Sequence, residues 1–350
     1  MKSQPDAGLR SSRILIVRLS AIGDVIQGLP VLNALRDRFP QATLAWVVEE
    51  RAAELLQGHQ ALDELFTLPR GWLRSPTTVR QLRRRLRAFG PEIAIDLQGL
   101  TKSAVAAWLS GARRRIGPGG SQGRELSKWF YTETVRPTSQ HRVDGYLELL
   151  KPLGIESPEV RFEIPDHRGD RVAAKEIARQ AGCQRGFCVL NPGAGWPSKR
   201  WPLDRFAAVA RHLGEAWGLP SLVISAGEQG RAWAERVVAS SEEHARLAPE
   251  MSLAQLAALC RRARLYLGSD SGPLHLAAAV ETLCIGLYGP WPAERHGPYG
   301  PGHVAIQKMV CRGSTRRRRN ASAKFMEAID VESVCAACDG VLRRDTSHAA

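Results

Sequence analysis

The first candidate for chemistry in this sequence is a carboxylate at a strand-to-helix corner. Apolar residues over 14–19 predict a buried parallel strand, and Asp24 follows at the start of a segment with helical spacing. Nucleotide-binding folds usually place glycines at such a corner, because backbone amides can then approach a phosphate. A carboxylate would repel a diphosphate, so we interpret Asp24 as a general base facing another substrate. The alternative is a helix cap, since Asp24 to Gln27 has capping-box spacing.

Two strand-end loops in the second half carry groups suited to a nucleotide. Lys199 and Arg200 follow the strand predicted over 187–192 and supply positive charge, unless they are solvated bases of a surface turn. Glu228 follows the strand predicted over 221–227, where an acid can accept hydrogen bonds from ribose hydroxyls. An acid is equally favoured at any helix N-terminus, so both interpretations stay open for Glu228.

A third loop predicts an anion site at a helix N-terminus. Asp270, Ser271 and Gly272 end a predicted strand, and Pro273 is suited to the first position of the helix that follows. The amides of that first turn point beyond the sheet, which suits a diphosphate. His275 in the same turn can donate to a phosphate or ribose oxygen, or it can pack against the sheet.

Positive charge also collects in loops of the first half. Lys102 follows a predicted strand at the start of a helix, where a base opposes the helix dipole, and this indicates that it faces an anion. Arg70, Arg74 and Arg124 add positive charge in other loops of the same half. The helix predicted over 79–89 is also basic, and a solvated basic face is the alternative for it.

Alternating strands and helices must position all of these side chains. The 350 residues exceed the usual size of one core, and the alternation repeats on both sides of a polar stretch at 164–170. We therefore expect an α/β protein with domains at 1–165 and 166–335. Residues 336–350 are small and polar, and we expect a disordered tail there.

The net charge limits the kinds of partner that the protein can have, and a missing motif argues against one class of enzyme. A formal net charge of +14 calls for an anionic partner: nucleic acid, an anionic lipid surface or a phosphorylated substrate. Nucleic acid is disfavoured because the bases lie in strand-end loops without an aromatic stacking platform. A dehydrogenase is disfavoured because G-x-G-x-x-G is missing after the first strand.

Other features bear on compartment and metal. Seven scattered cysteines and the lack of a leader or an apolar span predict a reducing, cytoplasmic setting. Cys335 and Cys338 form the only C-x-x-C, and no second ligand pair for zinc lies nearby. No strand-end loop carries D-x-D, so we expect no metal site.

Five motifs, in order along nearly the whole chain, resemble glycosyltransferase family 9, the ADP-heptose:lipopolysaccharide heptosyltransferases. They are RLSAIGDVIQGLPVL (18–32), WVVEE (46–50), DLQGLTKSA (96–104), NPGAGWPSKRWP (191–202), and GSDSGPLHLAAA with LYGP (268–290). WVVEE and DLQGLTKSA are more similar to the family's first-heptose members. The resemblance implies a GT-B fold of two Rossmann-like doubly wound domains facing a central cleft.

The resemblance also implies an activity. It implies heptose transfer from ADP-heptose to the phosphorylated, carboxylated Kdo region of the lipopolysaccharide inner core, with inversion and without a metal or another cofactor. The enzyme would act in the cytoplasm, associated peripherally with the inner membrane and not with nucleic acid. Two alternatives remain: a GT-B transferase of another nucleotide sugar, and a basic nucleic-acid-binding protein.

Roles carry over onto matching positions. The N-terminal domain would bind the acceptor, and the C-terminal domain would bind the nucleotide sugar. Asp24 would be the catalytic base and Lys199 the diphosphate lysine. The donor site would comprise Ser198, Glu228, Asp270, Ser271, Gly272 and His275. Lys102, Arg70, Arg74 and Arg124 would bind the anionic acceptor, although Gly71 and Leu73 dilute the basic loop at 70–74.

Overall fold

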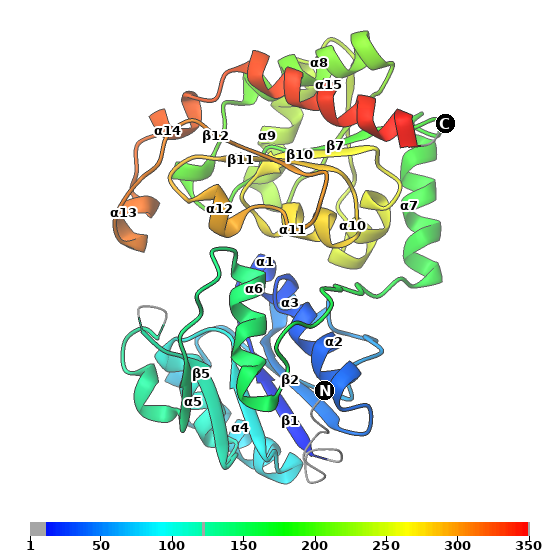
Figure 1. Cartoon of the computed structure of the whole chain (residues 1–350). Coiled ribbons are helices and arrows are strands. Elements are labelled where there is room, and N and C mark those ends of the chain that lie inside the picture. Colours follow the sequence, from blue (N-terminus) through cyan, green and yellow to red (C-terminus); the bar gives the residue numbers. More distant parts are fainter. Residues whose placement is uncertain (1–11, 121–122, 349–350) are drawn as a thin grey trace. The chain divides into compact units, whose positions relative to one another are not determined.

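The chain forms two compact units, Met1–Pro165 and Asp166–Ala350, which we call unit 1 and unit 2 and describe separately. The computed structural model describes residues 12–120 and 123–348. Each unit is a parallel sheet covered by helices (Figure 1). This is the α/β architecture that the alternating pattern predicts.

Unit 1 contains one sheet with helices between its strands. Its strands are β1 (Arg13–Val17), β2 (Thr43–Glu49), β3 (Glu64–Leu68), β4 (Ile93–Asp96), β5 (Arg114–Pro118) and β6 (Glu133–Val135). Its α-helices are α1 (Ile22–Ile26), α2 (Leu29–Arg38), α3 (Glu50–Ala53), α4 (Pro76–Phe89), α5 (Thr101–Leu109) and α6 (Arg142–Leu147). Short 3₁₀ helices are η2 (Trp72–Arg74), η3 (Ser127–Phe130) and η4 (Glu148–Leu153).

Unit 2 repeats the plan. Its strands are β7 (Cys188–Asn191), β8 (Ser221–Val223), β9 (Ala245–Leu247), β10 (Leu265–Ser269), β11 (Cys284–Tyr288) and β12 (Val304–Gln307). Its longer helices are α7 (Arg168–Gln180), α8 (Leu203–Trp217), α9 (Gly227–Ala239), α10 (Leu253–Cys260), α11 (Gly272–Ala279) and α15 (Val331–His348). Its short helices are η5 (Pro197–Lys199), α12 (Ala293–His296), α13 (Thr315–Arg319) and α14 (Lys324–Glu327).

Both sheets have the strand order of a Rossmann fold. The orders are β3-β2-β1-β4-β5-β6 and β12-β11-β10-β7-β8-β9, and neighbouring strands are parallel. In each unit the order reverses between the first and fourth strands, and open α/β sheets bind ligands beyond the carboxyl ends of the strands at this switch point. The loops after β1 and β4, and after β7 and β10, are therefore the functional positions. The expectation of two Rossmann-like doubly wound units is confirmed.

The apolar run of β1 explains why helices must cover both faces of the first sheet. Leu15 and Val17 belong to a buried cluster with apolar side chains of α4 and α5. Ile14 and Ile16 point to the opposite face, because side chains alternate along a strand, and they are just as buried. A continuous apolar strand in a parallel sheet requires this two-sided burial.

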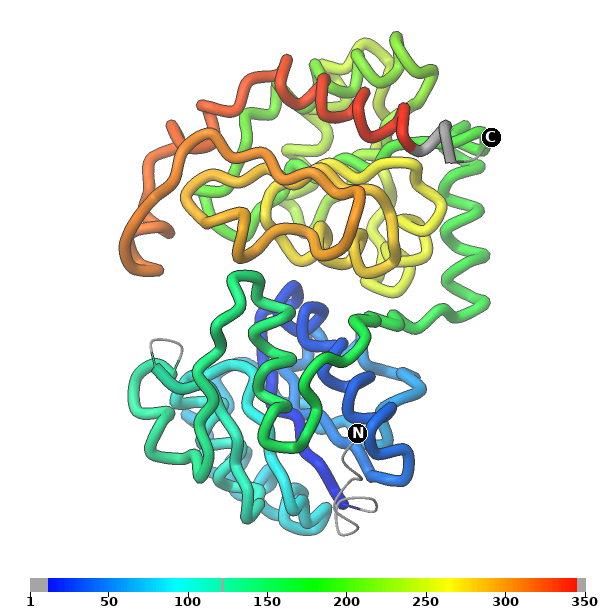
Figure 2. Tube along the Cα trace, in the orientation of Figure 1, coloured from blue at the N-terminus to red at the C-terminus, as the bar shows by residue number. Residues whose placement is uncertain are grey.

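The C-terminal segment differs from the disordered tail expected over 336–350. Helix α15 continues to His348 and lies along α8 (Figures 1 and 2). Val334, Cys338 and Leu342 recur at helical spacing and are buried in the core of unit 2. This apolar stripe orders the helix despite its polar composition. Residues 349–350 lie outside the described residues.

We expect Leu342→Ala to destabilise unit 2 by about 2–5 kcal/mol, because it removes buried methyl groups and leaves a cavity. Chemical denaturation monitored by circular dichroism measures the change. Ala336→Ser, at an exposed position of the same helix, is the control and should change stability by less than about 0.5 kcal/mol. Equal, small effects of both substitutions would show that α15 does not pack on unit 2.

Candidate active site

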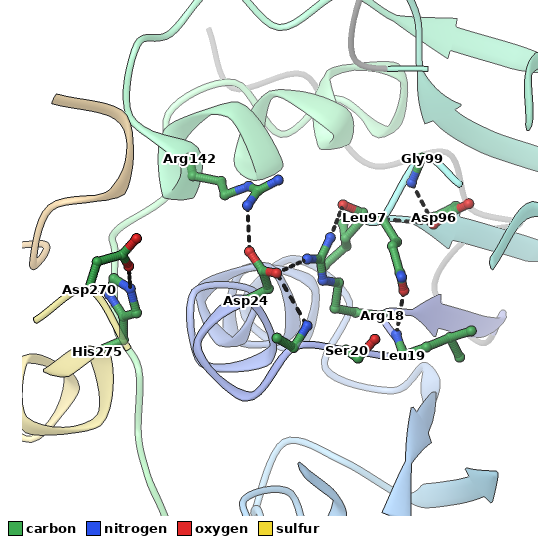
Figure 3. Close-up of polar contacts among 12 residues, drawn as sticks. Arg18, Leu19, Ser20, Asp24, Asp96, Leu97, Gly99, Arg142, Asp270 and His275 are labelled. Carbon is green, nitrogen blue, oxygen red and sulfur yellow. Dashed lines mark hydrogen bonds and ion pairs between the residues drawn. The ribbon is translucent and has the colours of Figure 1, made fainter. Parts of the chain in front are cut away.

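Asp24 lies just beyond the carboxyl end of β1, between two guanidinium groups (Figure 3). Arg18 Nη2 lies 2.5 Å from Asp24 Oδ2, and Arg142 Nη1 lies 2.6 Å from Asp24 Oδ1. The two cations favour the ionised form of the carboxylate. Its side chain keeps 22% of its exposure, whereas that of Arg18 keeps 3%. Asp24 is thus a partly accessible carboxylate at the first switch point.

Asp24 also contacts the backbone at the start of its own helix. The N–H of Ala21, the N-cap residue of α1, donates to Asp24 Oδ2 at 3.2 Å. Asp24 is the third residue of α1 and Gln27 follows the helix. The capping box that the spacing from Asp24 to Gln27 suggests, with Asp24 as the N-cap, therefore does not form. The contact accounts for a local structural role. The role of Asp24 as a base stays a prediction.

Arg18 also joins the loops that follow the two central strands (Figure 3). Its Nη1 donates to the carbonyl of Leu97, beyond β4, at 2.9 Å. Next to it, the N–H of Leu19 donates to Gln98 Oε1 at 2.9 Å. Because these bonds cross the switch point, the β1–α1 loop that precedes Asp24 is fixed against the β4–α5 loop.

Asp96, at the end of β4, is a structural carboxylate. Burial raises its pKa, and the hydrogen bonds that it accepts oppose the shift. It accepts from Tyr131 Oη at 2.6 Å, from Ser103 Oγ at 2.8 Å and from the N–H of Gly99 at 3.2 Å. Gly99 has φ of 68°, a left-handed conformation that glycine adopts without a steric penalty. Asp96 therefore fixes the β4–α5 turn and is inaccessible to a substrate.

Arg124, predicted as an acceptor contact, belongs electrostatically to the Asp24 cluster. Partial burial and the charges of Arg142 and Arg18 lower its pKa, while Glu125 and Asp24 act in the opposite direction. Arg124 thus adds positive charge near the ion pairs of Asp24, which suits an anion. Sequence reasoning missed Arg18 and Arg142.

Lys102 lies in the first turn of α5, where it was predicted, but its charge is balanced within unit 1. Its Nζ lies 2.5 Å from Glu49 Oε1, at the end of β2, and donates to Ser20 Oγ at 3.2 Å. This pair explains how a base is tolerated at a helix N-terminus. An anionic ligand at Lys102 has to compete with Glu49.

Arg70 and Arg74 lie in the exposed connection between β3 and α4. Strand β3 is the edge strand of the sheet, two positions from β1. Within residues 12–120 and 123–348, neither side chain forms an ion pair, and no contact joins either to Asp24. The structure therefore does not bring these two arginines into the Asp24 cluster.

In unit 2, the loops after β7 and β10 meet in a buried ion pair. Lys199 Nζ lies 2.5 Å from Asp270 Oδ2, and His275 Nε2 lies 3.4 Å from Asp270 Oδ1 (Figure 3 draws the histidine contact). Burial alone would raise the pKa of Asp270, but the charge of Lys199 and the contact with His275 hold it well below its usual range. Lys199 Nζ also lies 4.6 Å from the ring centre of Trp291. Three predicted residues are thus brought together.

Ser271 and Gly272 form the start of α11, directly beyond β10. Ser271 is the N-cap residue, yet its side chain makes no cap hydrogen bond to the first turn, which leaves amides there for an anion. Asn191, at the end of β7, donates to Ser271 Oγ at 3.3 Å and to Tyr266 Oη at 2.9 Å. These bonds connect the two central strands of unit 2 at the predicted anion site.

Ser198 and Glu228 make no such contacts. Ser198 Oγ is buried and lacks a hydrogen-bond partner among the described residues, as does Trp291 Nε1. Buried polar atoms are seldom left unpaired, so both are suited to contact a ligand. Glu228 lies exposed in the first turn of α9, at the carboxyl end of β8.

The described residues contain no group of three or more His, Cys, Asp or Glu side chains placed to hold a metal ion. Cys338 is buried, and burial raises the pKa of its thiol well above the usual range. Over the same residues, no helix is long and apolar enough to cross a lipid bilayer.

Comparison with known proteins is consistent with this arrangement. The model of glycosyltransferase family 9 (heptosyltransferase) matches residues 79–325. The lipopolysaccharide heptosyltransferase 1 of Pseudomonas aeruginosa is 29% identical over 304 residues, which cover 84% of this chain and 83% of that protein. The Escherichia coli K12 protein of the same name is 27% identical and covers 89% of this chain and 97% of that protein.

Solved structures show the same architecture. A family 9 glycosyl transferase from Veillonella parvula superimposes with a TM-score of 0.84 at 26% identity, covering 95% of this chain and 98% of that one. Escherichia coli heptosyltransferase WaaC with ADP has a TM-score of 0.74 at 24% identity, covering 94% and 99%, and supports the fold. The family match spans most of the chain, so this protein belongs to glycosyltransferase family 9, the heptosyltransferases, and is a transferase enzyme.

Proposed function

We propose that the enzyme transfers heptose from ADP-heptose to the Kdo region of the lipopolysaccharide inner core, with inversion and without a metal ion. Family membership and the names of the relatives support the lipopolysaccharide pathway. The observation that carries the mechanism is the partly exposed Asp24 carboxylate at the first switch point, paired with Arg18 and Arg142.

Unit 2 is the proposed site of the donor nucleotide. The first-turn amides of α11 and the Lys199 ammonium are suited to the diphosphate, whose charge grows as the sugar leaves. Buried Asp270 orients Lys199 through one carboxylate oxygen and contacts His275 through the other, and His275 is a further proposed contact of the donor. Ser198 Oγ supplies an unpaired hydroxyl, and exposed Glu228 is the proposed ribose contact.

Asp24 is the proposed base of unit 1. In the transfer, the acceptor hydroxyl oxygen bonds to the anomeric carbon of heptose, the bond from that carbon to the diphosphate oxygen breaks, and ADP leaves with the electron pair. The hydroxyl proton passes to Asp24. Two other carboxylates end neighbouring strands, but Asp96 is fully buried, and Glu49 is 13% exposed and paired with Lys102.

The arginines around Asp24 suit an acceptor that carries a carboxylate or phosphate. Such an anion can pair with Arg124 or Arg142 and thereby loosen the hold of the arginine on Asp24. Lys102 would contribute when Glu49 releases it, and Arg70 and Arg74 would contact more distant parts of a large acceptor.

The proposed setting is the cytoplasmic face of the inner membrane, where a lipid-borne acceptor is held, and no nucleic acid takes part. No metal is assigned a role, because Lys199 and the N-terminus of α11 provide positive charge where a divalent ion would otherwise act.

We expect Asp24→Asn to lower kcat by roughly 100-fold or more, because the amide cannot accept the hydroxyl proton. The affinity for ADP should change little, since the donor site is in unit 2. The melting temperature should fall, because the buried guanidinium of Arg18 loses its charged partner, so turnover is measured well below it. Steady-state transfer, thermal unfolding and calorimetry with ADP measure the three quantities.

Asp37→Asn is the matched control for this variant, because Asp37 also pairs with an arginine of unit 1 but lies on α2, away from the strand ends. It should leave kcat unchanged. Wild-type turnover by purified Asp24→Asn protein would refute the role of Asp24 as the base.

A double-mutant cycle tests the ion pair of unit 2. Lys199→Met should weaken ADP binding at least about tenfold, because it removes a cation and leaves the buried carboxylate of Asp270 to repel the diphosphate. It should also lower the melting temperature, since a buried charge loses its partner. Adding Asp270→Asn should recover stability without restoring full ADP affinity.

The control is Lys175→Met on the exposed surface of α7, which should change neither quantity. If the double variant binds ADP as tightly as the wild type, Lys199 contributes only to the fold and the diphosphate lies elsewhere.

Transfer should continue in the presence of excess EDTA, because the proposed mechanism neutralises the leaving diphosphate with protein groups. Product formation measured by mass spectrometry, with and without added magnesium, makes the comparison. Loss of transfer in EDTA that magnesium restores would overturn the metal-free part of the proposal.

A further inference from the structure

Unit 1 carries an exposed apolar surface that its fold does not explain. Trp129 is 86% exposed, Leu126 61% and Trp108 53%, and the rings of Trp108 and Phe130 pack edge to face with centres 6.1 Å apart. Large aromatic side chains are usually well buried, and a contiguous exposed apolar area marks an interaction surface. We call Trp108, Leu126, Trp129 and Phe130 the aromatic patch.

Hydrogen bonds anchor both ends of the segment that carries most of the patch. The N–H of Leu126 donates to Thr101 Oγ1 at 3.3 Å, which joins the loop to the start of α5. Arg115 Nε donates to the carbonyl of Phe130 at 2.6 Å at the other end of η3. Trp129 is therefore exposed on a segment that is hydrogen-bonded to the rest of unit 1 on both sides of it.

A basic helix adjoins the patch. Helix α4 packs against α5, which carries Trp108, and α4 turns Leu82, Leu86 and Phe89 inward. Its exposed residues include five arginines: Arg80, Arg83, Arg84, Arg85 and Arg87. Residues 76–130 contain eleven Lys and Arg against three Asp and Glu, one of which is the buried Asp96. Exposed Lys128 lies within the patch sequence itself.

We propose that the aromatic patch docks on an anionic lipid bilayer surface together with the exposed arginines of α4, which we call the arginine face. Tryptophan favours the boundary between headgroups and acyl chains, and arginine side chains favour the negative headgroup layer. The combination of apolar anchors with a neighbouring helix whose charged residues are all arginines matches that surface. The exposed rings of Trp108 and Trp129 are aromatic surfaces that sequence reasoning missed. A nucleic acid would pair with the charge and stack on these rings, but it would leave Leu126 without an apolar partner.

The position of the patch also suits a lipid-borne substrate. Leu126 lies two residues after Arg124, whose N–H donates to the carbonyl of Gly99 at 3.0 Å, in the β4–α5 loop that Arg18 joins to Asp24. A bilayer at the patch would therefore bring the headgroup of an embedded acceptor to the loops around Asp24. This use of the surface rests on the proposed function, whereas lipid binding itself does not.

Sedimentation with lipid vesicles tests the inference on the full-length protein. The wild type should bind vesicles of phosphatidylethanolamine and phosphatidylglycerol, should bind phosphatidylcholine vesicles less, and should be partly released by salt. The double variant Leu126→Ser, Trp129→Ser should bind the anionic vesicles about tenfold more weakly, because it loses the apolar anchor. Arg83→Gln, Arg84→Gln should bind about tenfold more weakly, through loss of charge, and this loss should be confined to anionic vesicles.

Matched controls lie on α7 of unit 2. Val172→Ser removes an exposed apolar side chain, and Arg168→Gln, Lys175→Gln removes two exposed cations; neither should weaken vesicle binding. Melting temperature and ADP affinity, measured on the same preparations, identify any variant that fails to fold. If the patch variant fails to fold, the arginine double variant still tests the inference.

The outcomes separate this inference from the proposed function. Vesicle binding that both α4 and patch variants leave at the wild-type level would overturn the lipid surface, whatever the transferase activity. Binding to a DNA oligonucleotide that the same variants abolish, without vesicle binding, would assign the surface to nucleic acid instead. If the variants lose vesicle binding but the wild type transfers no heptose, the docking surface is supported and the proposed function is refuted.

Discussion

A buried guanidinium is the constraint on which the strand-end loops of unit 1 depend. The side chain of Arg18 is 3% exposed, and a charge removed from water needs partners to be tolerated. Its partners come from three segments: the carboxylate of Asp24 in α1, the carbonyl of Leu97 beyond β4, and the ring of Tyr146 in α6 at 5.4 Å. Because Arg18 contacts all three partners at once, it fixes the loops after β1 and β4 and helix α6 relative to one another.

Unit 2 meets the same constraint with the charges reversed. Here the buried charge at the switch point is the carboxylate of Asp270, and the loop after β7 provides its cation, Lys199. The two units share one strand order, so their first-strand loops occupy equivalent positions in each fold. One of these loops presents a carboxylate held by arginines, and the other presents an ammonium held by a carboxylate. This difference suits a proton acceptor in one unit and a diphosphate in the other.

The sequence predicted those parts of the fold and the site that depend on local pattern. The strand before Asp24 and the helix start at Gly272 follow from apolar runs and turn residues within a few positions. The partners of these residues could not be predicted in this way. Arg142 lies 118 residues from Asp24, and Glu49 lies 53 residues from Lys102, so only the folded sheet brings each pair together.

Helix α15 shows a different limit. The spacing of Val334, Cys338 and Leu342 is a helical signal that the sequence contains, but the small and polar residues around it suggest a disordered tail. A stripe of three apolar residues orders a helix only when it packs against an apolar surface. The surface of unit 2 on which α15 packs forms only in the folded protein and cannot be recognised in the sequence. The composition of the segment therefore predicted disorder wrongly, because the order of this helix comes from tertiary packing.

The arginine face of α4 cannot be explained by the stability of the helix. Its inward side already supplies the packing, with Leu82 and Leu86 in the core of unit 1. On the outward side, Arg80 and Arg84 are four residues apart, as are Arg83 and Arg87, and like charges at this spacing destabilise an isolated helix by about 0.2–0.5 kcal/mol per pair. Glutamate at one position of each pair would turn repulsion into attraction without touching the core. A helix that forgoes this stabilisation has an outward face whose charge pattern is suited to an anionic surface rather than to the fold.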